Sequence, residues 1–447
     1  MWSPTTSVPR ARRELARSVL QVLQRWGYEE QALPPWLDYE ELRPALHRFA
    51  GEGCKFIGPD GDVRLLLPDA TLGVLTLWLE GTWPRSKPVR VAYETEVYRS
   101  MGGPWRRLRQ VGAELLGVSG PAGDAEVLAT AWESLQAVPG LEATVIINHV
   151  GIARAIAALA ARTAGVDDAD DVDAGAEALA DRLVQTLARG DFVTLEMILN
   201  TTVKSPLSEE VWGWLTFRGS LAEVGERLAR IPAGPEKDEV TAILAHLEEV
   251  TALAGGPAPL VDLGLLRDLG YYDGFVFQVV AAGAGGDEVV AGGGRYDSLF
   301  RAFDTPVAAA GFALDLDILT QAAGDRLPGG PDYVVAARGE GPVLRRAWEE
   351  AARLRAKGRS AVLLPLTGDE LGEEAAPEGE AAPGTAAGAS EVSIKVIVAD
   401  EKGLHQVEPG SPLGRRVLRS LMDHPAPPPA AGRIRGQAGE VMTDAGQ

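Results

Sequence analysis

Two pairs of polar residues in the N-terminal half of the chain are of types that bind ligands through charge and directional hydrogen bonds. Asp69 and Thr71 lie in the segment LPDAT, where the carboxylate supplies charge and the hydroxyl supplies a directional acceptor. Gln110 and Glu114 are four residues apart, so a regular β-strand would place both side chains on one face. Such groups either line a ligand pocket or form hydrogen bonds with one another inside the protein core.

Two other clusters have the composition of known motifs but not their spacing. The glycine-rich residues 283–294 would need a strand before them and a helix after them to bind a dinucleotide, whereas the pattern predicts strands on both sides and hence a hairpin turn. The aspartates of residues 167–173 lack the glycine and glutamate of a calcium loop and are interpreted as a solvated helix start. The sequence contains no phosphate-binding loop, zinc spacing or serine-nucleophile motif, so we expect no cofactor, no metal and no catalytic residue.

Charge is unevenly distributed along the 447 residues, whose formal net charge is −20. Residues 160–260 carry 18 acidic against 8 basic groups, which accounts for half of that net charge. An acidic chain argues against general nucleic-acid binding, because phosphate recognition needs a basic surface. The exception is the basic segment 85–109, which could dock a protein partner, steer anionic substrates or form a solvated loop.

The length and the cysteine content limit the class of protein. At about 150 residues per domain, the chain is long enough for two or three domains. The single cysteine, Cys54, excludes a disulfide framework and favours a reducing cytosol. No apolar run reaches the ~20 residues that span a bilayer, and the arginine-rich start lacks the apolar core of a signal peptide. We therefore expect a cytoplasmic protein without membrane contact.

The polar pairs must be positioned by alternating helices and strands in the first 150 residues. Apolar residues recur at helical spacing before Gly27, and β-branched residues are frequent in the segment 88–99. The expected elements are helices at 9–27, 69–79 and 123–137 and strands at 61–68, 88–99 and 108–117. Asp69 thus begins a helix, whereas Gln110 and Glu114 lie on a strand.

The rest of the chain divides by composition and periodicity. Alanine and leucine at helical spacing predict an all-helical insertion, and strands at 271–282 and 287–294 predict a long hairpin. The run 367–391 has seven acidic and no basic residues and is interpreted as a disordered insertion. The expected parts are a first portion of the main domain at 1–150, the helical insertion at 151–257, the second portion at 258–325, an α/β domain at 331–423 that the acidic run interrupts, and a disordered tail at 424–447.

Four segments in this order resemble the catalytic domain of class II aminoacyl-tRNA synthetases, and specifically the histidyl branch. They are the helix end and turn at 26–35, the strand–loop–strand segment at 90–117, the segment 262–277 with an arginine before a tyrosine pair, and the glycine-rich segment 292–319. The resemblance implies an α+β fold in which helices flank an antiparallel sheet, with an all-helical insertion and a small α/β C-terminal domain.

The same resemblance implies a histidine pocket built from the polar pairs and the tyrosine segment. The seven pocket residues would be Asp69, Thr71, Gln110, Glu114, Arg267, Tyr271 and Tyr272. The first two would hold the ammonium group, and the next two would face the carboxylate end and the imidazole. The arginine would meet the carboxylate, and the tyrosines would flank the ring. The alternative is that these polar groups are relics satisfied within the core.

The nucleotide half of the site departs from the family pattern. Adenylation needs a cation at each end of the nucleotide and an aromatic plane for adenine. Arg99 and Arg109 remain as a relic nucleotide or anion site. In contrast, Ile318 replaces the closing arginine, and Asp315 and Asp317 bring carboxylates to the phosphate region. The other changed family positions are Leu67, Met101 and Leu108. Because like charge in a low-dielectric cleft repels phosphate, we expect aminoacylation to be lost.

A synthetase body that keeps the amino-acid pocket and loses the nucleotide site resembles the family of ATP phosphoribosyltransferase regulatory subunits. The resemblance implies a non-catalytic chain that assembles with the short catalytic subunit in the first step of histidine biosynthesis. It further implies homodimers within a hetero-octamer, activation by assembly, inhibition by histidine and no tRNA binding. Two alternatives stay open: a divergent histidyl-tRNA synthetase, and a stand-alone histidine-binding paralogue with neither partner nor catalysis.

Overall fold

The computed structural model describes residues 4–46, 53–100, 104–164, 172–203, 205–266, 272–283, 286–323, 333–338, 341–366, 395–400 and 402–423. Tertiary contacts divide the chain into two compact units, one formed by Val8–Leu327 and the other by Met1–Ser7 with Pro328–Gln447. The finer division into domain parts stays a prediction. The expected insertion at 367–391 and tail at 424–447 lie outside the described residues.

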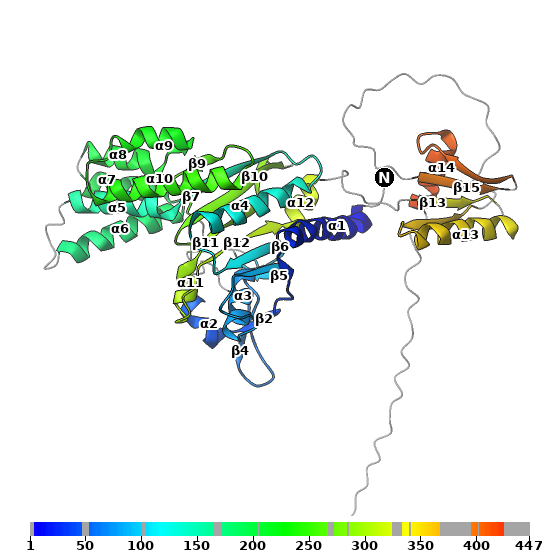
Figure 1. Ribbon diagram of the computed structural model, residues 1–447, viewed down its shortest axis with the longest axis horizontal. Helices are drawn as coiled ribbons and strands as arrows, with labels where there is room; N and C mark the ends of the chain where they lie inside the picture. Colours follow the sequence, from blue (N-terminus) through cyan, green and yellow to red (C-terminus); the bar gives the residue numbers. More distant parts are fainter. Residues whose placement is uncertain are drawn as a thin grey trace, which may run out of the picture. The chain divides into compact units, whose positions relative to one another are not determined.

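A nine-stranded sheet forms the framework of the first unit (Figure 1). In spatial order its strands are β1 (Glu29–Glu30), β5 (Val89–Arg99), β6 (Arg106–Leu116), β12 (Ala309–Asp315), β11 (Gly286–Arg295), β10 (Phe275–Gly283), β7 (Ala143–His149), β9 (Leu260–Asp262) and β8 (Arg218–Gly219). All neighbouring pairs are antiparallel except β1 with β5 and β7 with β9. The predicted α+β class is confirmed, and the sheet expected to be antiparallel contains these two parallel pairs.

The strand that carries Gln110 and Glu114, β6, forms a long ladder with its neighbour β5. β5 and β6 pair over their whole length, from Val89 opposite Leu116 to Arg99 opposite Arg106. The predicted hairpin is also present, since β10 and β11 pair in antiparallel fashion. Helices α4 (Gly120–Gln136) and α12 (Leu316–Ala323) pack against β6, β11 and β12 and bury the apolar side chains of these strands.

Further helices and a small second sheet lie beside this framework. They are α1 (Pro4–Arg25), α2 (Tyr39–Leu46), α3 (Ala70–Leu79), α11 (Asp297–Arg301) and a small sheet of β2 (Trp36–Asp38), β4 (Val63–Leu66) and β3 (Lys55–Ile57). The amphipathic pattern predicted for α1 buries Leu15, Val19 and Leu23 in the core. Gly27 follows this helix with φ of +81°, a conformation in which a side chain would be strained.

Helices make up the predicted insertion where the structure describes it, apart from connecting turns and one short strand. Its helices are α5 (Val150–Ala164), α6 (Val172–Ala188), α7 (Phe192–Thr202), α8 (Leu207–Leu215), α9 (Leu221–Leu228) and α10 (Pro235–Ala254). A capping box of Ser220 and Glu223 begins α9. The departure from the all-helical expectation is β8, whose Arg218 and Gly219 pair with β9. A strand of two residues is too short to show an alternating pattern, so the sequence between the predicted helices gave no sign of it.

The C-terminal unit is an α/β sandwich whose sheet has the order β14-β13-β15-β16. Its elements are β13 (Tyr333–Ala337), α13 (Pro342–Ala356), β14 (Ala361–Pro365), β15 (Lys395–Asp400), β16 (Gly403–Val407) and α14 (Pro412–Asp423). α13 packs on the sheet face that carries Val335, and α14 packs on the face that carries Val334. The described residues of this unit include 12 basic and 5 acidic side chains. In neither unit do the described residues include a helix with the length and apolar character needed to cross a membrane.

Candidate ligand-binding site

A cavity of about 230 Å³ lies among β5, β6, β11, β12 and the start of α3. The predicted pocket residues that line it are Asp69, Thr71, Gln110, Glu114 and Tyr272, together with Arg99 of the predicted anion site. The other two predicted pocket residues, Arg267 and Tyr271, lie outside the described residues. Both polar pairs therefore reach one site, although more than 35 residues separate them in the sequence.

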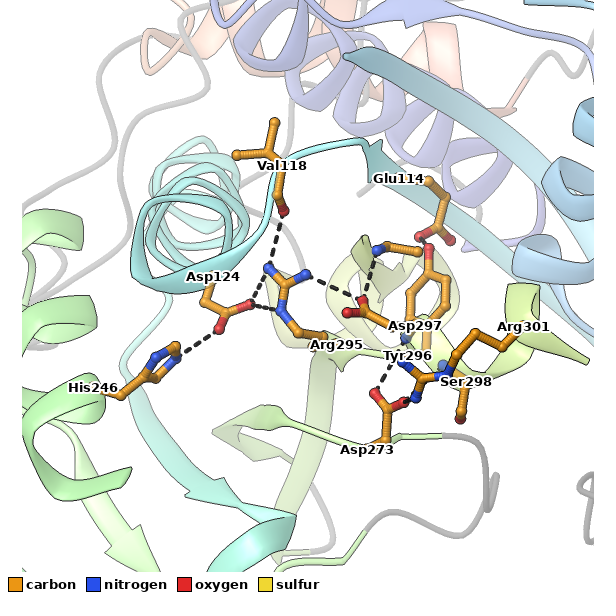
Figure 2. A network of polar contacts seen from close by, with 11 residues as sticks. Glu114, Val118, Asp124, His246, Asp273, Arg295, Tyr296, Asp297, Ser298 and Arg301 are labelled. Atoms are coloured by element: carbon orange, nitrogen blue, oxygen red, sulfur yellow. Dashed lines mark hydrogen bonds and ion pairs between the residues drawn. The ribbon is translucent and has the colours of Figure 1, made fainter. Parts of the chain in front are cut away.

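Glu114 is the most deeply buried acid of this cavity, with 1% of its surface exposed. The Thr71 hydroxyl donates to its Oε1 at 2.9 Å. The Tyr296 hydroxyl donates to its Oε2 (Figure 2). Burial raises the pKa of Glu114 to about 8, because desolvation of the carboxylate outweighs the donors that stabilise it. The side chain is therefore mostly protonated at neutral pH.

Asp69 holds the start of α3 and one arginine of the cavity. Its carboxylate caps the helix by accepting a hydrogen bond from the Thr71 N–H at 2.9 Å, and the Arg99 Nη2 donates to it at 3.4 Å. Both Asp69 and Thr71 are more than nine-tenths buried. The helix cap thus fixes a carboxylate and a hydroxyl at one wall of the cavity.

Two polar atoms at the cavity have no hydrogen-bond partner among the described residues: the Oε1 of Gln110 and the Nε of Arg99. A buried polar atom left unpaired costs about 1–3 kcal/mol. A ligand that supplies one acceptor and one donor would remove this cost. The cavity therefore favours a ligand that has both kinds of group.

Three glycines on neighbouring strands make room for the buried side chains. Gly311 lies directly opposite Glu114, and a Cβ at this glycine would lie 1.6 Å from the Glu114 Oε2. A Cβ at Gly112 would lie 2.6 Å from the Tyr93 hydroxyl, and one at Gly293 would lie 2.2 Å from the Gly311 carbonyl oxygen. Glycine at these three positions therefore leaves the space that the Glu114 carboxyl, the Tyr93 ring and the neighbouring backbone occupy beside the cavity.

The substitution Gly311→Ala is expected to lower the free energy of unfolding by about 1–3 kcal/mol, because the new methyl group overlaps the Glu114 carboxyl and forces it to move. Urea unfolding followed by circular dichroism measures the change. The matched control is Gly225→Ala in α9, where a Cβ would contact nothing within 4 Å and alanine favours the helix. Equal stability of the Gly311 variant and the wild type would contradict this interpretation.

The two carboxylates expected in the phosphate region have different partners. Asp315 lines the cavity and caps α12, accepting from the N–H groups of Asp317 at 2.9 Å and Ile318 at 3.0 Å. Burial raises the pKa of Asp315. The carboxylate of Asp317 instead pairs with Arg12 at 3.0 Å. One carboxylate, rather than two, therefore faces the cavity.

The predicted anion site is also divided. Arg99 lines the cavity, whereas Arg109 is bonded to Glu96 at 3.0 Å and to Asp317 at 3.3 Å and is not among the lining residues. We therefore revise the expectation of a site that both arginines share. Of the remaining changed positions, Leu108 lines the cavity and Leu67 is fully buried in the core. Met101 lies outside the described residues.

Two tyrosines of the site were missing from the predicted set. Tyr93 lies on β5 opposite Gly112, and its hydroxyl donates to the Phe312 carbonyl at 3.2 Å. Burial and the nearby Glu114 raise the pKa of Tyr93. Tyr296 follows the glycine-rich strand directly, so its place next to that strand was the available signal. Within the described residues, no group of three or more His, Cys, Asp or Glu side chains could hold a metal ion.

Most arginines of the basic segment 85–109 are paired within their own unit. Arg90 forms two hydrogen bonds to Glu126, at 2.6 and 2.7 Å. Arg107 lies 3.6 Å from Glu96, and Arg99 and Arg109 have the carboxylate partners described above. These pairs neutralise much of the positive charge. They weaken the hypothesis that this segment docks a partner or steers anions.

Comparison with known proteins gives the family. The sequence model of the histidyl-tRNA synthetase family matches residues 7–319. The chain is 34% identical over 366 residues to the ATP phosphoribosyltransferase regulatory subunit of Moorella thermoacetica, and the match covers 79% of this chain and 88% of that protein. The chain belongs to the regulatory-subunit branch of the histidyl-tRNA synthetase family. The predicted family is thereby confirmed.

Two further matches show what this branch shares with the synthetases. The histidine–tRNA ligase of Methanocaldococcus jannaschii is 29% identical to this chain, over 68% of the chain and 70% of the ligase. A crystal structure from Bacillus halodurans, described as an ATP phosphoribosyltransferase regulatory subunit/histidyl-tRNA synthetase, superposes with a TM-score of 0.65 at 24% identity. The superposition covers 80% of this chain and 89% of that chain, so this chain has the fold of that structure.

Proposed function

We propose that this chain is the non-catalytic regulatory subunit of an ATP phosphoribosyltransferase and acts in histidine biosynthesis. The relatives that carry this name support the regulatory role. The observation that carries the proposal is the composition of the cavity: the described residues of the predicted histidine pocket line it, together with the Asp315 carboxylate, which the family resemblance puts where a synthetase would bind phosphates. Cytoplasmic location is part of the proposal, because a reducing compartment suits a chain with one cysteine.

Histidine is the proposed ligand of the cavity. The volume of about 230 Å³ lies below the ~300–1,000 Å³ of pockets for drug-sized molecules, which suits an amino acid. Asp69 and Thr71 would hold the ammonium group, with Gln110 at the carboxylate end and Glu114 at the imidazole. Arg267, Tyr271 and Tyr272 would complete the pocket as the family resemblance implies. The unpartnered atoms of Gln110 and Arg99 support a ligand with both donors and acceptors.

Loss of aminoacylation is supported by the electrostatics of the same cavity. Among the described residues that line it, Arg99 is the one cation, and Asp69 already pairs with it. Arg109, the second expected cation, is held by Glu96 and Asp317. A triphosphate would therefore meet the Asp315 carboxylate without the pair of cations that adenylation needs.

The proposed assembly contains two kinds of contact: with the short catalytic chain, and with a second copy of this chain. A groove of about 720 Å³ runs beside α1 and the outermost strand β1, and it is lined by Arg13, Arg17, Glu29, Glu30 and Glu94 among others. Interspersed charges of both signs suit a self-complementary contact between two copies. This supports the proposed homodimer.

The proposal includes no tRNA. The acidic helical insertion supports this part, because its 18 acidic residues would repel phosphates. The charge argument does not extend to the C-terminal unit, whose described residues are predominantly basic. The insertion alone therefore carries the electrostatic case against RNA.

Co-expression with a short-form catalytic chain tests the proposal. We expect the two chains to elute together on size exclusion and the phosphoribosyl transfer rate to exceed that of the catalytic chain alone, which is the control. We also expect no histidine-dependent exchange of pyrophosphate with ATP. Such exchange would instead establish a divergent histidyl-tRNA synthetase. Histidine binding without a complex would establish a stand-alone paralogue.

A further inference from the structure

Arg295 anchors the chain directly before Tyr296, whose hydroxyl contacts the cavity residue Glu114. It ends β11, is 8% exposed, and uses every nitrogen of its guanidinium group. Its Nε donates to the Asp124 Oδ1 at 2.8 Å, its Nη1 to the Asp297 Oδ1 at 3.2 Å and its Nη2 to the Val118 carbonyl at 3.2 Å (Figure 2). The residue that precedes Tyr296 is therefore held from three sides.

Tyr296 is fixed by the same group of contacts. Its N–H donates to the Ala309 carbonyl at 2.8 Å, and the Ala309 N–H donates to the Asp297 Oδ1 at 2.8 Å. The ring stacks on Phe300 with the planes 25° apart. These contacts fix both the backbone and the ring of Tyr296. The orientation in which its hydroxyl meets Glu114 therefore depends on the positions of Arg295 and Asp297.

Asp124 extends these contacts to the helical insertion. This carboxylate is 0% exposed, and its Oδ2 pairs with the His246 Nε2 of α10 at 2.8 Å (Figure 2). The His246 ring contacts the edge of His149 with ring centres 5.7 Å apart. Burial lowers the pKa of His149 to about 4, so this neighbour is neutral at physiological pH.

We propose that His246, on the helical insertion, is a positioning residue for the cavity: through Asp124 and Arg295 it sets the orientation of Tyr296 and hence the state of Glu114. The physical reason is the sharing of one buried carboxylate. Without His246, the Asp124 Oδ2 has no hydrogen-bond partner among the described residues, and a buried carboxylate oxygen left unpaired is costly. Asp124 must rotate toward another donor, and Arg295 moves with it because two of its nitrogens bond the other oxygen.

The effect on Glu114 has a defined sign. The Tyr296 hydroxyl lowers the pKa of Glu114, whereas burial raises it. Displacing Tyr296 removes a stabilising donor, so the pKa of Glu114 must rise. The same displacement leaves the Glu114 carboxyl less well oriented for a bound ligand, so the affinity of the cavity for that ligand must fall.

The test compares His246→Phe with His246→Gln, whose amide nitrogen can replace the Nε2 donor, and with Thr251→Val as a control on the same helix. The hydroxyl of Thr251 donates to the carbonyls of Leu247 and Glu248 within α10, at 3.0 Å each. Infrared titration of the protonated carboxyl band, assigned with Glu114→Gln, measures the pKa. Calorimetry with histidine measures the affinity, and this arm alone rests on the proposed function.

We expect His246→Phe to raise the pKa of Glu114 by about half a unit or more and to weaken histidine binding about threefold to tenfold. His246→Gln should restore both values, and Thr251→Val should change neither. If His246→Phe does not fold, His246→Asn, which is too short to reach Asp124, takes its place. An unchanged Glu114 pKa in the folded variant overturns the inference. A shifted pKa in a protein that binds no histidine supports the inference and refutes the proposed ligand.

Discussion

Replacing Glu114 by glutamine is expected to flatten the pH dependence of stability between pH 4.5 and about pH 8. Burial raises the pKa of Glu114 from 4.5 to about 8. The folded protein therefore keeps a proton that the unfolded chain releases over this interval. The associated stability is fully present below pH 4.5 and is lost as the pH rises through 8. At about 1.36 kcal/mol per pKa unit, the loss reaches up to about 5 kcal/mol.

Urea unfolding at several pH values between 5 and 9 measures this difference. The wild-type free energy of unfolding should fall with pH relative to that of Glu114→Gln, which lacks the titrating group. Glu142→Gln is the matched control, because Glu142 is exposed and should leave the wild-type slope unchanged. Parallel pH profiles for the wild type and Glu114→Gln would show that this carboxyl is ionised in the folded protein.

The substitution Asp124→Ala is expected to be among the most destabilising single changes in the chain, at about 3–5 kcal/mol. Asp124 is fully buried and pairs with Arg295 at 2.7 Å, so its removal leaves a buried guanidinium without its carboxylate. Urea unfolding measures the loss. The double variant Asp124→Ala/Arg295→Met should recover part of it, because no unpaired charge then remains buried.

A solvent-exposed ion pair provides the comparison for Asp124. Glu14 and Arg17 pair at 3.0 Å on the surface of α1, and Glu14→Ala should cost less than about 1 kcal/mol. If Asp124→Ala costs no more than Glu14→Ala, or if the effects of Asp124→Ala and Arg295→Met simply add, the buried pair is not coupled as its geometry implies.

The elements around the cavity were predictable because their signals are local. The predicted strand 88–99 corresponds to β5 (Val89–Arg99), and the predicted helix 69–79 corresponds to α3, with Asp69 as its cap. β-branched content and a capping carboxylate are properties of a few consecutive residues. The family resemblance added the relation between the segments, which brought Asp69 and Glu114 to one site.

The parts that escaped prediction depend on register and on long-range pairing. β7 was missing from the expected elements, although its core of Val145, Ile146 and Ile147 is typical of a strand. Tyr93 enters the site only because the β5–β6 register places it opposite Gly112. No local pattern reports such a pairing.

The partners of charged residues were equally hard to predict from the sequence. From the sequence, Arg109 was assigned, together with Arg99, to a relic nucleotide or anion site. In the folded chain it is bonded to Asp317, which is 208 residues away. The acidic run at 367–391 similarly concealed the basic character of the described C-terminal residues. Net charge over a segment therefore predicts electrostatics only where the partners of each charge are local.

The short strand β8 has a practical consequence for shortening this protein. It lies within the helical insertion, yet it covers the outer side of β9, with Arg218 paired to Asp262 at 2.7 Å and Phe217 accepting from the Leu263 N–H at 3.0 Å. Excising the whole insertion would uncover the N–H and C=O groups of β9. An exposed edge strand with unpaired backbone groups can pair with other chains, so we expect such a deletion to make the protein prone to aggregation. A stable shortened form must keep Phe217–Gly219 in place as the outer strand.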